Sequence, residues 1–273
     1  MPLNTYWYIA FLAVIAVGTT EGEPEACNSR TWAMANDTSA LLQKGLLRPD
    51  GLVLNGVQSD LQQGLALQAD FERYAATLPE GATKELLRSF KICGSCNNFR
   101  RFGEPHDGGY LMCMDHMDGV TAAYSVGVAQ HDKWSGDVSG TWKVANSSAA
   151  ASQIDIEGSE WGAFAAADVS TLKKFRQLVV EFHWLQEVHK HPDYLKVMQK
   201  LQLTGFRVVH LHGNNNSPMV DTTDYKIPQV VEVTFDSSAQ PMTTCLQDQQ
   251  MRPLDMPNIA GNAELPLAHL PSF

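Results

Sequence analysis

The sequence predicts an α/β fold, because strand patterns and helix patterns alternate through its central part. The segments typical of strands are residues 120–128, 153–156, 177–183, 206–211 and 229–235. Helix patterns at residues 163–174 and 193–203 separate the second, third and fourth of them, which favours parallel pairing. The last two strands are joined by a polar loop without a helix pattern, so an antiparallel hairpin is expected to finish the sheet.

A leader and a helical region are expected to precede this domain. Residues 6–17 are apolar but fall short of the ~20 residues that span a bilayer, and Ala16-Val17-Gly18 offers a small-x-small cleavage pattern. We therefore predict a signal peptide over residues 1–18. A short membrane anchor is the alternative, because no Lys or Arg precedes the apolar run. Residues 19–92 predict a helical lead-in, with helices at residues 38–48, 57–78 and 83–91.

The composition narrows the class of partner. Lys and Arg number 20 against 30 Asp and Glu, a formal charge of −10, so nucleic-acid binding is not expected. A hydrophobic fraction of 44% suits a globular domain with a sizeable core, and no stable membrane span is expected. With its leader, the chain is predicted to be secreted or to lie in the lumen of the secretory pathway.

The cysteines and the glycosylation sequons agree with an oxidising compartment. Cys93 and Cys96 are spaced like a redox pair or half of a zinc site, but a second Cys-x-x-Cys is missing, which argues against structural zinc. Disulfides are expected among the five cysteines with one thiol left over, and their pairing stays open: Cys27, Cys93, Cys96, Cys113 and Cys245. Sequons begin at Asn36, Asn146 and Asn215.

The most informative stretch is Ile154-Asp-Ile-Glu-Gly-Ser-Glu-Trp161. It places Asp155 and Glu157 at the end of an apolar strand, just before a glycine turn. Open α/β sheets bind their ligands at the carboxyl ends of parallel strands. These two acids are therefore candidate functional residues, and a strand end that happens to be acidic is the alternative.

Further motifs lie before and after this stretch along the chain. They are Arg101-Phe-Gly-Glu-Pro-His-Asp-Gly-Gly-Tyr110 with Cys113, Tyr124-Ser-Val-Gly127, the Ile154–Trp161 stretch, Val180-Glu-Phe-His183, Val208-Val-His-Leu-His-Gly-Asn-Asn215 and Val231-Glu-Val-Thr-Phe235. Together they resemble the methyltransferase-like and FkbM-type family of S-adenosylmethionine-dependent methyltransferases, over roughly residues 93–236. The resemblance implies a Rossmann-like class I methyltransferase sheet, S-adenosylmethionine as cofactor, and a glycan, lipid or small molecule as methyl acceptor.

The resemblance also assigns candidate site residues. Asp155 and His183 are the predicted catalytic residues, with His183 as a base for an acceptor hydroxyl; a structural histidine is its alternative. The predicted cofactor-binding residues are Asp107, Gly108, Gly109, Tyr110, Gly127, Asp132 and Glu157. An ordinary turn is the alternative for the Asp107–Tyr110 tetrad. No metal is predicted, because His183, Glu187, His189 and His191 match no helical His-Glu ligand pattern.

The chain departs from the family pattern between the first two strands of the domain. A single glycine, Gly127, follows the first strand, and residues 129–153 are too few for two further βαβ units of ~30 residues each. The second and third strands of the sheet are therefore expected to be missing, and residues 146–152 are predicted not to form a strand. This loss favours the alternative function, a non-catalytic binding protein without a cofactor site. Residues 237–273 are predicted to be a loosely held tail that contains several prolines.

Overall fold

A computed structural model gives the arrangement of the domain. It describes residues 81–127, 132–141, 149–222, 225–246, 252–265 and 267. The predicted leader, the helices predicted at residues 38–48 and 57–78, Cys27, and the sequons at Asn36 and Asn146 lie outside the described residues. In the part of the chain that is described, no helix is both long and apolar enough to cross a membrane.

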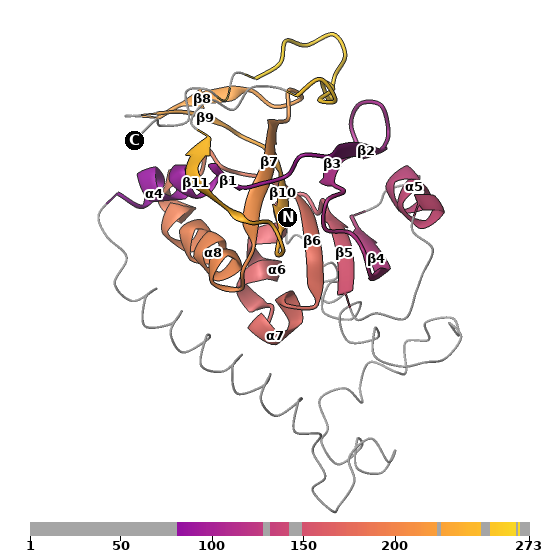
Figure 1. Ribbon diagram of the computed structural model, residues 1–273. Helices are drawn as coiled ribbons and strands as arrows, with labels where there is room; N and C mark the ends of the chain where they lie inside the picture. The colour runs from indigo at the N-terminus through magenta and orange to yellow at the C-terminus, as the bar shows by residue number, and fades with distance from the viewer. Residues whose placement is uncertain are drawn as a thin grey trace, which may run out of the picture.

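A mixed five-stranded sheet forms the centre of the domain (Figure 1), and the α/β prediction is confirmed. Its strands, in spatial order, are β4 (Val120–Val126), β5 (Ala149–Ile154), β6 (Phe175–Phe182), β10 (Val231–Asp236) and β7 (Arg207–Gly213). Strands β4, β5 and β6 are parallel, whereas β10 is antiparallel to both β6 and β7. The predicted antiparallel hairpin is therefore present, and β4, β5, β6 and β7 all end at one edge of the sheet. We call it the carboxyl edge.

Helices cover one face of the sheet. They are α4 (Ala82–Ser89), α6 (Glu160–Ala166), α7 (Val169–Leu172) and α8 (His191–Leu203), with a 3-10 turn η2 (Val188–Lys190) before α8. The helix predicted at residues 163–174 is two helices, because Ala167 and Asp168 adopt extended backbone between α6 and α7. The ring of Trp161 stacks on both Phe182 and Tyr194, with centroids 4.2 and 4.0 Å apart, and this contact joins α6 and α8 to β6.

A β-hairpin and a helix cover the other face. The hairpin consists of β2 (Phe99–Gly103) and β3 (Gly109–Cys113), and helix α5 (Lys133–Thr141) packs against β2 and β4 (Figure 1). Side chains along β6 alternate between the two faces: Leu178 and Val180 lie in the core beneath the helices, whereas Val179 lies in the core beneath the hairpin. The hairpin face therefore also receives Gln177 and Glu181.

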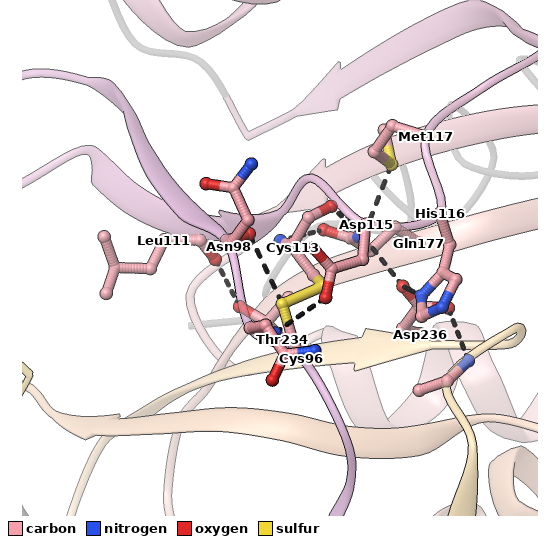
Figure 2. Close-up of a disulfide and its surroundings, with 12 residues drawn as sticks. Cys96, Asn98, Leu111, Cys113, Asp115, His116, Met117, Gln177, Thr234 and Asp236 are labelled. Atoms are coloured by element: carbon pink, nitrogen blue, oxygen red, sulfur yellow. Dashed lines mark hydrogen bonds and ion pairs between the residues drawn. A yellow bond between two sulfur atoms is a disulfide. The ribbon is translucent and has the colours of Figure 1, made fainter.

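Polar contacts hold the hairpin on the sheet (Figure 2). The side-chain amide of Gln177 pairs with the backbone N–H and carbonyl of Cys113, both at 2.9 Å, and Thr234 donates to the carbonyl of Leu111 at 2.6 Å. Gln177 also donates to Asp236 at 3.1 Å. The hydrogen bonds from Gln177 and Thr234 pair buried polar groups of β6 and β10 with the backbone of β3, which fixes the position of β3 over both strands.

Two disulfides confirm the expectation of cysteine pairing. Cys93 bonds Cys245 and so joins β1 (Ile92–Gly94) to β11 (Pro241–Leu246), while Cys96 bonds Cys113 beside the hairpin. Because Cys93 and Cys96 have different partners, the Cys-x-x-Cys segment is neither a redox pair nor half of a zinc site in this structure. Both bridges are consistent with a secreted or lumenal protein.

The prediction that residues 146–152 form no strand is wrong from Ala149 onward, since β5 begins there. Alanine is disfavoured in strands. Here Ala150 is buried in the core beneath the helices and Ala151 in the core beneath the hairpin, and this packing outweighs the low strand preference. Strand β5 pairs directly with β4. Within the described residues, no strand lies between them.

The prediction of a loosely held C-terminal tail is wrong for residues 252–265, and also for β11, which pairs with β1 and is joined to it by the Cys93–Cys245 disulfide. Asp255 accepts a hydrogen bond from His210 at 2.8 Å, and both side chains are buried. The two ring nitrogens of His212 lie 3.1 Å from Glu232 and 3.2 Å from Glu264. Such contacts leave no hydrophobic periodicity in the sequence, so pattern analysis misses them.

A last pair of short strands, β8 (Met219–Asp221) and β9 (Lys226–Pro228), lies in the loop before β10.

The contact of His212 predicts a pH dependence of stability. Burial alone would lower its pKa, but Glu232 and Glu264 outweigh burial and raise the pKa to about 9, from an ordinary value of 6.5. Its contribution is therefore complete below pH 6.5 and is lost as the pH rises through about 9. Relative to His212→Gln, we expect the wild type to lose up to about 3 kcal/mol of unfolding free energy between pH 6 and pH 10 in urea titrations. Parallel pH profiles for the two proteins would contradict this role.

The structure also predicts that the sequon at Asn215 carries no glycan. The residue is 5% exposed, and its Nδ2, the atom that would bear the sugar, donates to the carbonyls of Ile259 and Asn262 at 3.2 and 3.1 Å. Peptide mass spectrometry of protein expressed through the secretory pathway should find Asn215 unmodified, with the sequons at Asn36 and Asn146 as internal comparison. An occupied Asn215 in folded protein would contradict the packing of residues 252–265.

Candidate functional site

A polar cluster lies at the carboxyl edge of the sheet, on the hairpin face. Asp155 follows β5 directly, and His183 follows β6 directly. Glu181 lies two residues before His183 on the same face, and Tyr110 of β3 reaches the cluster from the hairpin. The predicted catalytic residues Asp155 and His183 are therefore neighbours, with 3.9 Å between Asp155 Oδ1 and His183 Nε2.

His183 is the centre of the cluster. Its Nδ1 donates to Oε1 of Glu160 at 3.1 Å. The opposite nitrogen, Nε2, lies 3.6 Å from Glu181 Oε1, 3.7 Å from Glu157 Oε2 and 3.9 Å from Asp155 Oδ1. One imidazole is thus surrounded by four carboxylates, of which one is in hydrogen-bonding contact and three are slightly farther away.

Glu160 holds the loop that carries the acids. Its Oε1 also accepts the backbone N–H groups of Ile156 at 2.9 Å and Gly158 at 3.1 Å, and its side chain is fully buried. The indole of the next residue, Trp161, donates to the carbonyl of His183 at 2.8 Å. The loop after β5 and the end of β6 are therefore tied to each other at two points.

Tyr110 of β3 contacts the cluster from the side of the hairpin. Its hydroxyl lies 3.4 Å from Glu181 Oε2 and 3.5 Å from Asp155 Oδ2, and Gln153 Nε2 approaches it at 3.5 Å. Asn214, which follows β7, donates to Glu181 Oε1 at 2.7 Å. Every strand that ends at the carboxyl edge, apart from β4, thus contributes a side chain to the cluster.

The crowding of acids in a buried place shifts their proton affinities. Burial raises the pKa of Asp155 to about 7, with His183 opposing the shift and Glu157 adding to it. Burial and the charge of Asp155 raise the pKa of Glu181 well above its usual range. Burial would lower the pKa of His183, but the hydrogen bond to Glu160 and the nearby acids raise it. The cluster therefore favours cations, protons included, over neutral or anionic ligands.

Two residues at the rim adopt left-handed backbone although they are not glycine. Glu157 has φ of 54° and Trp184 has φ of 66°, and the indole of Trp184 donates to the carbonyl of Glu157 at 3.4 Å. Gly158 lies against this indole, where a Cβ would overlap it. Such backbone is costly and is often found at functional sites. It places the Glu157 side chain, 84% exposed, at the mouth of the cluster.

The predicted cofactor residues divide into three groups. Asp107 and Gly108 lie in the turn of the β2–β3 hairpin and Gly109 begins β3, and Asp107 Oδ1 accepts a hydrogen bond from Asn258 at 3.1 Å. Glu157 and Tyr110 belong to the cluster. The remaining two, Gly127 and Asp132, do not reach it through their side chains.

Gly127 and Asp132 have structural roles. Gly127 has φ of 99°, and a Cβ there would overlap the carbonyl oxygen of Asp155, so the glycine permits close packing of the turn after β4 against the loop after β5. Asp132 Oδ1 accepts the N–H of Ser135 at 2.9 Å and caps the start of α5. The alternative metal cluster does not form either, because His191 is buried and bonds Thr83 and the carbonyl of Leu185.

Several side chains of the site were missed by the predictions. These are Gln153, Glu160, Asn214, Glu232 and Asn258. Glu181 lies on the same strand face as His183, two residues before it, as the two-residue period of a strand predicts. Asn258, which donates to Glu232 at 2.6 Å, gives no local signal because it is far away in the sequence.

A cavity of about 490 Å³ lies on the helix side of the same loop, between α6 and α8. Gly158 of the loop and Trp161 of α6 line it, together with Tyr194 and the lysines Lys190 and Lys200 of the η2–α8 segment. Lys200 is buried and donates to the carbonyls of Phe164 and Ala165, at the end of α6. The loop after β5 therefore separates an acidic cluster from a cavity with basic groups.

Comparisons with protein families, with curated proteins and with solved structures found no match to this chain.

The contacts of Glu160 predict a large effect of its removal. Glu160→Ala leaves the N–H groups of Ile156 and Gly158 and the ring of His183 without their acceptor, so we expect a loss of about 3 kcal/mol of unfolding free energy in urea. Glu160→Gln keeps an acceptor oxygen of the same reach and serves as the matched control, with an expected loss of about 1 kcal/mol. Equal losses in the two variants would show that the carboxylate does not organise the loop.

Proposed function

We propose that this chain is an S-adenosylmethionine-dependent methyltransferase of the secretory pathway, with a glycan, lipid or small molecule as acceptor. Its fold would be a class I sheet without the second and third strands. Three parallel strands followed by an antiparallel pair support this proposal, and so does the order of the motifs in the sequence. The observation that carries it is the acidic cluster around His183 at the carboxyl edge, where sheets of this class bind ligands.

The charge of the cluster suits one half of the proposed cofactor. The sulfonium and the amino group of S-adenosylmethionine are cationic, and Asp155, Glu157 and Glu181 supply negative charge in a partly dehydrated place. When bound, the cofactor supplies an electrophilic methyl group. Asp155 and Glu157 would orient the cationic groups, and His183 would accept the proton of an acceptor hydroxyl.

The nucleoside half has less support among the described residues. The space at Gly127 is filled by the Asp155 carbonyl, and the carboxylate of Asp132 is committed to the cap of α5. These two observations favour a second candidate function, in which the chain binds a cationic ligand at the cluster and transfers no methyl group. Both candidates use the same acids, so they differ in the ligand and not in the site.

Titration calorimetry with S-adenosylhomocysteine distinguishes the candidates. For a methyltransferase we expect saturable one-to-one binding to the secreted protein, and a loss of at least about tenfold in affinity in Asp155→Asn, because the amide cannot balance the ligand's amino group. The matched control is Asp193→Asn on α8, whose carboxylate pairs with Lys196 on the surface. A folded protein, checked by circular dichroism, that gives no binding heat would favour the second candidate.

A further inference from the structure

We propose that the cluster around His183 is a binding site for a divalent transition-metal ion, with His183 Nε2, Asp155 and neighbouring carboxylates as ligands. An ion at this site uses the same Nε2 and carboxylates as the proposed methyl transfer, so this inference deepens the second candidate function, in which the cluster binds a cationic ligand without methyl transfer, and it rests on that candidate. It departs from the sequence-based expectation of no metal, which considered the histidines after β6 rather than the acids after β5.

The spacing of the atoms supports the proposal. Oxygens from Asp155, Glu157 and Glu181 lie 3.6–3.9 Å from His183 Nε2. Ligands at ~2.1 Å from one ion are about 3.0–3.5 Å from each other in octahedral or tetrahedral geometry. Movements of a few tenths of an ångström would therefore bring Nε2 and each of these oxygens to the separation of two ligands of one ion.

A second observation points to a missing partner. The side chain of His183 is nine-tenths buried, and its hydrogen bonding within the described residues uses Nδ1 alone. The three oxygens near Nε2 are beyond hydrogen-bonding distance. The fully buried carboxylate of Glu160 faces the same ring, and its Oε2 has no hydrogen-bond partner there. Buried polar atoms without partners are rare and mark places where an ion or a water belongs.

The surroundings of His183 resemble the support that metal-binding histidines require. Such histidines usually donate their other ring nitrogen to a carboxylate, which sets the tautomer and the ring orientation. Here Nδ1 donates to Glu160, so the lone pair of neutral His183 is on Nε2, toward the other acids. Trp161 further holds the backbone carbonyl of His183. The ring is thus already fixed in the orientation that an ion needs.

The site is open on one side. The side chain of Asp155 is 30% exposed and that of Glu157 is 84% exposed, whereas Glu181 is buried. An ion can therefore enter from solvent and keep positions for water or for an oxygen of a ligand. One imidazole among carboxylates favours Mn²⁺ or Zn²⁺ over Mg²⁺ and Ca²⁺, which bind oxygen ligands alone.

Two other groups of metal-ligating side chains in the described residues are weaker candidates. Both include Cys113, in one case with Cys96 and Asp115 and in the other with His116 and Asp236. Both cysteines are in a disulfide, so they offer no thiolate. In contrast, Asp155, Glu160 and His183 each offer one atom, and these atoms lie within 4.8 Å of one another.

The test is a titration of Mn²⁺ into the secreted protein, freed of metal by a chelator that is then removed. Electron paramagnetic resonance reports the free ion. We expect saturable loss of the free Mn²⁺ signal at one ion per chain, with competition by Zn²⁺ and not by Mg²⁺. Asp155→Asn and His183→Ala should each weaken binding at least tenfold, and Glu160→Gln, which acts through His183, by about tenfold. Asp193→Asn, which removes an acid on the surface of α8, should leave binding unchanged.

Two results would overturn the site. One is a folded protein without saturable Mn²⁺ or Zn²⁺ binding; the other is binding that Asp155→Asn and His183→Ala both leave intact. Circular dichroism of each variant identifies loss of folding, and Asp155→Asn, whose side chain is partly exposed, covers the case in which His183→Ala does not fold. The S-adenosylhomocysteine titration is also repeated in chelator, so that nucleoside binding is measured without metal. Nucleoside binding and metal binding are then tested by separate measurements, and a negative result in one does not decide the other.

Discussion

The buried carboxylate of Glu160 is the contact on which the carboxyl edge of this protein depends. It accepts two backbone N–H groups from the loop after β5 and the ring N–H of His183 after β6. A charged group that is fully buried is tolerated only when its donors are in place. The loop, the histidine and the start of α6 are therefore positioned by one side chain, and the acids of the cluster follow from their positions.

The two faces of the sheet have different roles in the domain. The helix face is apolar, with stacked rings of Trp161, Phe182 and Tyr194, and stabilises the fold by burial. The hairpin face alternates apolar and polar side chains, and the polar ones end in the cluster at the carboxyl edge. Its groups are held by the hairpin and by residues 252–265, so that side chains distant in sequence form one polar layer.

Much of the sheet could be predicted from local sequence, and the environment of the site could not. Alternation and apolar runs located β4, β6, β7 and β10, and the position of Asp155 at a strand end followed from the same patterns. The first half of β5 was missed because its alanines are held by burial rather than by preference. Glu160 was missed because it resembles an ordinary acid in the first turn of a helix, and Asn258 because its partners come from the other end of the domain.

The bridge between Cys93 and Cys245 has a consequence for the integrity of the chain. The two cysteines are 152 residues apart, so almost the whole described domain lies inside one covalent ring. A protease that cuts an exposed loop within this ring, such as the loop between β3 and β4, opens the ring without dividing the molecule. Under non-reducing conditions the cleaved and the intact protein would keep the same mass of polypeptide, and only a reductant would release the fragments.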